Sequence, residues 1–261
     1  MSALITDRKI IKKLNDLAPI NSPKLYRQVM DLLAKCVEWT PEKTEEYKED
    51  GTFEFFWTLV AIHREFFKLN PFGDLFGEYI TYNELLNVRA GQFFTPINLT
   101  EMISDMLNTV NTEEFNTILD PASGTGRFML STAKTYHEAG AGYNFLFTNI
   151  DIDPMMWTYS TMNAILHDIP SINIHGDTLA IKYWGAYLVV PTNTSHDGAP
   201  GIGLWYKLDP EKLMAQHRAM IESSRTPKGM EQFVGKVKSR TREKPVKFGS
   251  IKPKQKRLFD E

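Results

Sequence analysis

Cysteine is almost missing from this chain of 261 residues, which contains Cys36 and no other. A single cysteine excludes an internal disulfide and a metal site made of several thiolates. Cys36 lies in an apolar pattern of helical spacing, so we expect a buried structural thiol rather than a nucleophile. The sequence also lacks a run of about 18 apolar residues, and its first residues lack the charged-then-apolar order of a secretory signal. No membrane span is expected, and the predicted location is the cytoplasm.

Acidic residues are few at the end of the chain, whereas the rest of the chain has fewer basic than acidic residues. Residues 224–261 contain 12 Lys or Arg against 4 Asp or Glu, whereas residues 1–223 contain 18 against 28. The basic segment is poor in apolar residues and has no periodicity, so we expect it to be disordered in isolation. Its charge indicates binding to phosphate, and hence to DNA, unless it serves only as a solubilising tail.

Residues 1–90 are predicted to form a helical subdomain. Apolar residues recur at helical spacing over 25–36, 53–67 and 74–86, which is typical of helices that pack one face on a core. The charged stretch 42–51 is interpreted as a loop or a frayed helix.

From Thr95 onward, helical and strand patterns alternate. Helices are expected over 96–107, 126–137, 153–167 and 209–223, and strands over 116–120, 143–150, 172–175 and 187–190. Residues 192–203 are rich in Gly, Pro, Asn and Ser and are expected to be a loop. The alternation is typical of an α/β domain with right-handed crossovers and a largely parallel sheet, to which we assign residues 91–223.

A glycine-rich turn follows the first expected strand. The sequence Asp120-Pro-Ala-Ser-Gly-Thr-Gly126 joins that strand to a helix. Gly124 and Gly126 permit a tight turn and let backbone approach a ligand at the helix N-terminus, where a carboxylate is favoured. Asp120 could accept a hydrogen bond from the ammonium group of a methionine moiety. The plainer interpretation is a structural strand–helix turn.

Acidic residues also follow the second and third expected strands. Asp151 is placed to accept the ribose hydroxyls of a nucleoside cofactor, whereas Asp153 before Pro154 suits the N-cap of a helix. Asp177 could bind an adenine amino group, or it could be another turn or N-cap residue. Three acids at successive strand ends, together with the glycine turn, favour a site for S-adenosylmethionine (SAM).

Residues 74–180 resemble the SAM-binding half of the N6-adenine DNA methyltransferases, in particular the modification subunits of type I restriction systems. The similar segments are Asp74–Ile80, Gly91–Pro96, Asp120–Gly126, Met162–Ile169 and Gly176–Leu179. The resemblance implies a SAM-dependent methyltransferase (Rossmann-like) sheet, truncated here, behind a shortened helical subdomain. It further implies that Phe94, Thr95 and Pro96 hold the methionine end of SAM. The backbone of the cofactor, its ribose and its adenine would be held by Asp120, Ser123, Gly124, Gly126, Asp151 and Asp177.

The acceptor motif of that family, Asn/Asp-Pro-Pro-Tyr/Phe after the fourth strand, is missing. Its oxygens orient the amino nitrogen of a flipped adenine while its aromatic ring stacks on the base. At the corresponding place this chain reads Tyr187-Leu-Val-Val-Pro-Thr-Asn193, which leaves Asn193 and Tyr187 as the candidates for a variant acceptor site. Beyond Pro191 we expect one more helix and the tail, so the fourth strand would form an open edge of the sheet.

Two functions remain open from the sequence. The chain is either a SAM-binding, DNA adenine-N6 methyltransferase-like protein with a variant acceptor site, or a non-catalytic SAM-fold factor that binds DNA, a sliding clamp or a restriction-system subunit. Methylation of another acceptor is a third reading. The clamp enters because Gln255–Phe259 resembles the Gln-x-x-Leu-Phe peptide that bacterial proteins insert into it; the similarity of five residues is also compatible with an incidental tail end.

Overall fold

A computed structural model describes residues 2–17, 24–37, 43–86, 92, 94–107, 115–196 and 198–224. The predicted clamp peptide and nearly all of the basic tail lie outside the described residues. Within those residues no helix is both long and apolar enough to cross a membrane.

The first part of the chain is helical, as the sequence predicts. Its helices are α1 (Ser2–Leu17), α2 (Lys24–Lys35), α3 (Thr44–Glu49), α4 (Thr52–Leu69) and α5 (Leu75–Tyr82). The charged stretch before α4 therefore forms a short helix, and α5 is shorter than expected because Asn83 and Glu84 leave the helical path, Glu84 with a φ of 54°. The apolar stripe of α2 is buried. Cys36, just after it, is 3% exposed, and burial raises the pKa of its thiol to about 12, so the expected structural thiol is confirmed.

Helices and strands then alternate along the chain. They are α6 (Ile97–Leu107), β1 (Asn116–Asp120), α7 (Arg127–Glu138), β2 (Phe145–Asp151), α8 (Pro154–Leu166) and β3 (Ser171–Asp177). The strands β1, β2 and β3 are parallel neighbours, because α7 after β1 and α8 after β2 return the chain to the same end of the sheet. This part of the α/β prediction is confirmed.

The sheet departs from the prediction after β3. The strand β4 (Lys182–Val190) runs antiparallel to β3, and β7 (Leu204–Lys207), which the sequence analysis missed, adds a fifth strand in the order β1-β2-β3-β4-β7. Only Thr178–Ile181 joins β3 to β4, and a connection that short cannot make the crossover that a parallel strand requires. The expected loop at 192–203 also contains two short paired strands, β5 (Ser195–His196) and β6 (Ala199–Pro200).

The open edge of the sheet is therefore not where we expected it. The strand β4 lies inside the sheet, between β3 and β7, while β1 lies at one edge. Leu119 of β1 is 56% exposed. It lies on the sheet face where α9 (Pro210–Ser224) packs beside Ile150, Ile174 and Ala186 of the neighbouring strands.

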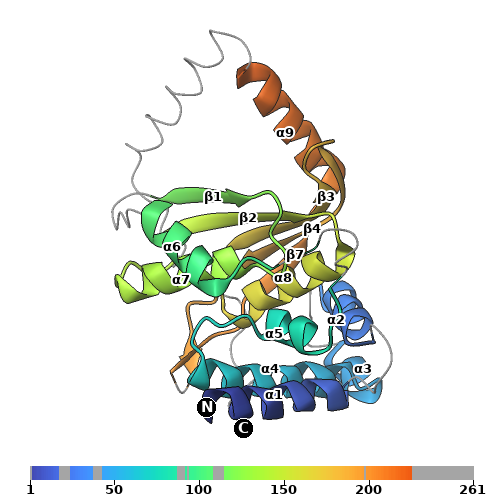
Figure 1. Ribbon diagram of the computed structural model, residues 1–261. Coiled ribbons are helices and arrows are strands. Elements are labelled where there is room, and N and C mark those ends of the chain that lie inside the picture. Colours follow the sequence, from blue (N-terminus) through green and yellow to red (C-terminus); the bar gives the residue numbers. More distant parts are fainter. Residues whose placement is uncertain are drawn as a thin grey trace.

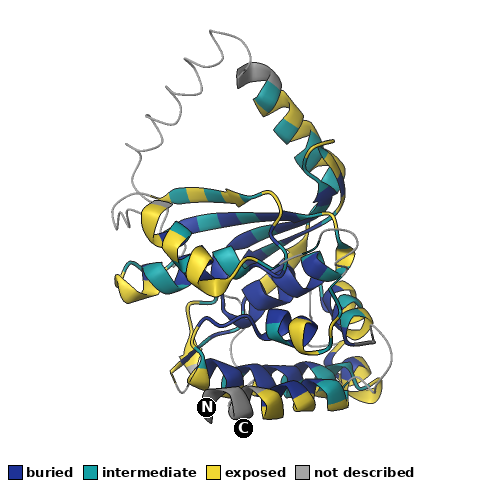
Figure 2. Cartoon of the chain, in the orientation of Figure 1, coloured by how far each residue is buried: buried dark blue, intermediate teal, exposed yellow. Residues whose placement is uncertain are grey.

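The other face of the sheet carries most of the core (Figure 1). The helices α7 and α8 pack against it, and α5, α4 and α1 form a further layer beyond α8. Figure 2 shows the buried residues concentrated between the sheet and these helices. One contiguous cluster extends from Leu14 of α1 to Phe145 and Phe147 of β2, so the N-terminal helices and the sheet share a core.

A pair of buried histidines crosses this core. His63 of α4 lies with its Nε2 atom 3.2 Å from Nε2 of His167, the residue after α8, and both side chains are almost fully buried. His167 Nδ1 donates to the carbonyl oxygen of Asn163 at 2.9 Å, so its Nε2 atom is the acceptor for the proton of His63 Nε2. Desolvation is the main reason that the pKa of His63 lies well below its usual value and that of His167 falls to about 4.

The histidine pair should make stability depend on pH. Both folded pKa values lie below the ordinary value of 6.5, so the pair contributes fully above pH 6.5, and its contribution is lost as the pH falls towards about 4. We expect the free energy of unfolding of the wild type to exceed that of a His63→Gln/His167→Gln variant above pH 6.5, by a margin that narrows on acidification. Urea unfolding over this pH range measures the margin, and a margin that stays constant would contradict the assignment.

Candidate cofactor site at the carboxyl ends of β1, β2 and β3

Three acidic side chains meet at one edge of the sheet. Asp120, Asp151 and Asp177 are the last residues of β1, β2 and β3. Because these strands are parallel neighbours spaced about 4.8 Å apart, their carboxyl ends lie side by side. The structure thus brings together the three acids that the sequence placed at successive strand ends.

The glycine turn lies against the first two of these acids. Gly124 and Gly126 have φ angles of 55° and 89°, in the left-handed region that favours glycine. A Cβ atom at Gly126 would lie 3.0 Å from Ser160 Oγ, so close packing against α8 also requires glycine there. Ser123 Oγ is buried and has no hydrogen-bond partner among the described residues. An unsatisfied hydroxyl in such a turn is a group that a polar ligand could satisfy.

Asp151 holds the turn in place. One of its carboxylate oxygens accepts from the Gly124 amide at 2.7 Å, and the other accepts from the Asp153 amide at 2.9 Å. Asp120 accepts from the Ala122 amide at 3.2 Å. Desolvation raises the pKa of both Asp120 and Asp151, so a ligand that brings hydrogen-bond donors or positive charge to this edge would be stabilised.

The remaining predicted acids have local roles. Asp153 caps α8 by accepting from the Met155 and Met156 amides, which confirms the predicted N-cap, and it also accepts from Gln92 Nε2 at 2.6 Å. Asp177 accepts from the Ala180 amide at 2.9 Å. The turn interpretation of Asp177 is therefore realised, and its half-buried side chain lies at the end of β3.

Phe94 and Thr95 are brought to the glycine turn by Arg127. The Arg127 guanidinium lies 4.4 Å from the centre of the Phe94 ring, and its Nη1 atom donates to the Thr95 carbonyl oxygen at 3.3 Å. A Cβ atom on Gly124 would lie 3.7 Å from the Phe94 ring. Pro96 is exposed and directly precedes α6, where its carbonyl oxygen accepts from the Thr100 amide at 3.1 Å.

The two candidates for an acceptor site are not at this edge. In the antiparallel pair, Lys182 of β4 lies opposite Asp177, whereas Val189 lies opposite Ser171 at the other end of β3. Asn193 follows β4 and so lies at the far edge, about 20 Å away at 3.3 Å per residue, where its amide donates to Asp168 at 2.8 Å. Tyr187 lies midway along β4, is 6% exposed and stacks on Trp157. The antiparallel direction of β4 removes Asn193 from the site.

A comparison with known protein families finds a match over the segment that contains this edge. Residues 69–194 match the model of the family described as N-6 DNA Methylase. This segment is similar to the N-6 DNA methylase family. All three acids, the glycine turn and β4 fall inside the match, whereas α1, α2, α3, β7 and α9 fall outside it.

Two similar proteins are a methylase subunit and a solved methyltransferase structure. The chain is 32% identical over 99 residues to the type I restriction enzyme MjaIX methylase subunit of Methanocaldococcus jannaschii, and this match covers 36% of the chain but 17% of the subunit. The crystal structure of a putative class I S-adenosylmethionine-dependent methyltransferase from Listeria monocytogenes aligns with a TM-score of 0.40 and 17% identity, over 67% of this chain and 54% of that one.

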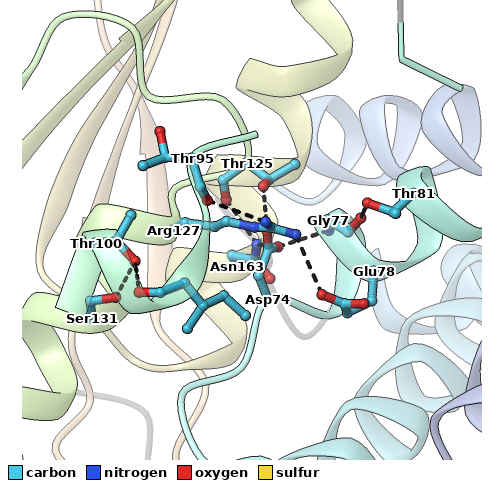
Figure 3. Close-up of polar contacts among 11 residues, drawn as sticks. Asp74, Gly77, Glu78, Thr81, Thr95, Thr100, Thr125, Arg127, Ser131 and Asn163 are labelled. Atoms are coloured by element: carbon cyan, nitrogen blue, oxygen red, sulfur yellow. Dashed lines mark hydrogen bonds and ion pairs between the residues drawn. The ribbon is translucent and has the colours of Figure 1, made fainter. Parts of the chain in front are cut away.

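A buried aspartate joins the candidate cofactor site to the helical layer (Figure 3). Asp74 caps α5 by accepting from the Gly77 amide at 2.8 Å, and it accepts from Arg127 Nε at 2.8 Å and Asn163 Nδ2 at 2.9 Å. It also accepts from Thr125 Oγ1 at 2.5 Å. The carboxylate thus ties α5, the glycine turn, α7 and α8 to one point.

From the sequence, Asp74 has no predicted role beyond its place in the segment Asp74–Ile80, which resembles the methyltransferase family. A capping signal was present, since Asp74 precedes an apolar helical run, but nothing local indicates Arg127 or Asn163 as partners. Those contacts join residues 53 and 89 positions apart.

Loss of the Asp74 charge should destabilise the whole fold. In an Asp74→Asn variant one end of the side chain becomes a donor facing other donors, and Arg127, whose side chain is 12% exposed, loses its main partner. We expect the free energy of unfolding in urea to fall by about 3–5 kcal/mol. Glu65→Gln, which removes the half-exposed pair with Lys13, is the matched control and should cost less than about 1 kcal/mol; equal effects of the two variants would refute the assigned role.

Proposed function

We propose that this chain binds SAM at the carboxyl edge of β1, β2 and β3 and acts in the N6-methylation of adenine in DNA. One observation carries the proposal: the acids of β1 and β2 flank a glycine turn whose Ser123 hydroxyl has no partner among the described residues, inside the segment that matches the N-6 DNA methylase family model. The 99-residue match to the type I methylase subunit covers 17% of that subunit. The activity, the substrate and the partners of this chain are therefore proposals.

The residues at the edge suit the parts of SAM in chemical terms. Asp120 accepts from the ammonium group, and Phe94, Thr95 and Pro96 lie beside the methionine end. Each carboxylate oxygen of Asp151 uses one lone pair, one for the Gly124 amide and the other for the Asp153 amide. The second lone pair on each oxygen is available for the ribose hydroxyls. Asp177 accepts from the adenine amino group. When bound, SAM supplies an electrophilic methyl group; the residues named here bind and orient it.

The acceptor site requires groups from elsewhere. Asn193 lies at the opposite edge and Tyr187 is buried in β4, so neither reaches a base beside Asp120. A partner chain that pairs with the edge strand β1 could bring oxygen acceptors to this place. The partner would be another subunit of a restriction system, and DNA would be held by the basic tail; the sliding clamp and a cytoplasmic location are further proposals.

The same observation favours a second candidate function. A protein that keeps the cofactor edge but lacks acceptor groups could be a non-catalytic SAM-fold factor, which binds DNA or a restriction-system subunit without transferring a methyl group. Methyl transfer distinguishes the two.

Removal of the Asp120 carboxylate should weaken SAM binding. A hydrogen bond to a charged group contributes about 1.5–3 kcal/mol, so we expect the affinity of Asp120→Ala measured by calorimetry to fall at least about tenfold. Asp31→Ala, which removes an exposed acid of α2, is the control and should leave the affinity unchanged. Equal affinities of wild type and Asp120→Ala would place the cofactor elsewhere.

Methyl transfer is tested with labelled SAM and unmethylated DNA, followed by nucleoside analysis. Label in N6-methyl-2′-deoxyadenosine is the expected result for an active enzyme, with or without an added partner subunit. Label in another base would identify a different acceptor. If calorimetry detects SAM binding but no label is transferred in either case, the binding-factor function is the correct one.

A further inference from the structure

A short strap of the chain lies at the candidate cofactor site, directly before α6. The strap consists of Gln92 and residues 94–96, and side chains of two helices hold it near its two ends. Phe94 is half-buried, and a Cβ atom on Gly124 would lie 3.7 Å from its ring. The ring of the strap therefore lies at the glycine turn, beside the ends of β1 and β2.

The first anchor of the strap is Gln92. Its Nε2 atom donates to Asp153 Oδ2 at 2.6 Å. The other oxygen of Asp153 caps α8, and the Asp153 amide donates to Asp151 at 2.9 Å. This anchor therefore fixes the strap relative to Asp151, the acid that ends β2.

The second anchor is Arg127, the first residue of α7 (Figure 3). Its guanidinium lies 4.4 Å from the centre of the Phe94 ring. The three nitrogen atoms of the guanidinium have acceptors within the protein, which are Asp74 at 2.8 Å, the Thr95 carbonyl oxygen at 3.3 Å and Glu78 at 3.4 Å. Because the buried Asp74 carboxylate holds the guanidinium, the strap is attached to a fixed point.

The anchors hold a segment that itself adds little to the core. Thr95 and Pro96 are exposed, and Phe94 is only partly buried. Without the anchors, a ligand would have to order this segment on binding. Because the anchors order it before a ligand arrives, they raise the affinity for the part of the ligand that the strap contacts.

We propose that Gln92 and Arg127 are positioning residues, which hold the strap against the methionine end of SAM and act on the cofactor only through Phe94 and Thr95. The inference deepens the proposed function and rests on it, since it takes the strap as one wall of the cofactor site. The wall serves one end of the cofactor, so the anchors should favour SAM over a nucleoside that lacks the methionine part.

The test compares SAM with 5′-methylthioadenosine in calorimetric titrations. The second compound has the same adenine, ribose and sulfur atom but lacks the aminocarboxylate end. Arg127→Lys keeps a cation beside Asp74 and loses the planar group that lies on Phe94 and reaches Thr95. We expect this variant to weaken SAM binding about 3- to 30-fold, the range for a cation–π contact, and to leave the binding of 5′-methylthioadenosine unchanged.

A second variant tests the other anchor. Gln92→Ala releases that end of the strap and leaves the cap of α8 in place, since the cap uses the other oxygen of Asp153. The same selective loss of SAM affinity is expected. Lys134→Gln is the matched control, because it removes a cation of α7 that pairs with Glu101 of α6 at 2.7 Å rather than with the strap. It should change neither affinity.

Hydrogen exchange in the cofactor-free protein follows the strap itself. The Leu99 and Thr100 amides donate to the Pro96 carbonyl oxygen at 2.9 Å and 3.1 Å. Exchange of these two amides should be faster in both strap variants than in the wild type, and unchanged in Lys134→Gln.

The outcomes separate this inference from the proposed function. If the wild type binds SAM and both strap variants bind it equally well, or if they weaken the two compounds alike, the positioning role is refuted and the cofactor site stands. A wild type that binds 5′-methylthioadenosine as tightly as SAM also refutes only the role of the strap. A wild type that binds neither compound refutes the cofactor site itself. Should Arg127→Lys fail to fold, Gln92→Ala decides alone.

Discussion

The carboxylate of Asp74 is the interaction on which the rest of the structure depends. A buried charge is costly unless hydrogen bonds replace the water that it loses. Here the donors come from four places in the chain: the first turn of α5, the glycine turn, α7 and α8. Since the same Arg127 that binds Asp74 also lies on Phe94 and bonds to Thr95, the position of the segment before α6 follows from this carboxylate. The helical layer therefore does more than cover the sheet: it sets the geometry of the candidate cofactor site.

A second constraint is the short connection after β3. It forces β4 to run antiparallel and moves its carboxyl end to the far side of the sheet. The consequence for chemistry is direct, because side chains that follow β4 cannot meet a ligand held at the ends of β1, β2 and β3. The separation of Asn193 from the three acids is thus a result of the direction of β4. At the other side of the sheet, β1 is an edge strand, with backbone groups that a further strand could pair with.

The same short connection also allows two rings of the sheet to stack on Trp157 of α8. Because β4 returns beside β3, Gly185 lies opposite His175, and Tyr187 lies opposite Asn173. The rings of His175 and Tyr187 can therefore both stack on Trp157. A parallel strand at this place would begin at the other end of the sheet, and Trp184 would not lie beside Asp177. The acids and the exposed Trp184 ring thus lie near the same end of β3 for a single topological reason.

The sequence by itself determined the local features of this protein. Helical periodicity located α2, α4 and α8, the strand β1 was bounded correctly, and the N-cap at Asp153 and the turn at Gly124 and Gly126 were identified, because capping and positive φ depend on residues close together in the chain. It also determined that Asp120, Asp151 and Asp177 end successive strands. Only the tertiary structure decided the direction of β4, the existence of β7, the partners of Asp74 and the stacking of Trp157 between His175 and Tyr187. These depend on contacts between residues far apart in sequence, such as Asp74 with Asn163 or Trp205 of β7 with Leu33 of α2, and no local pattern of polarity records which distant groups will meet.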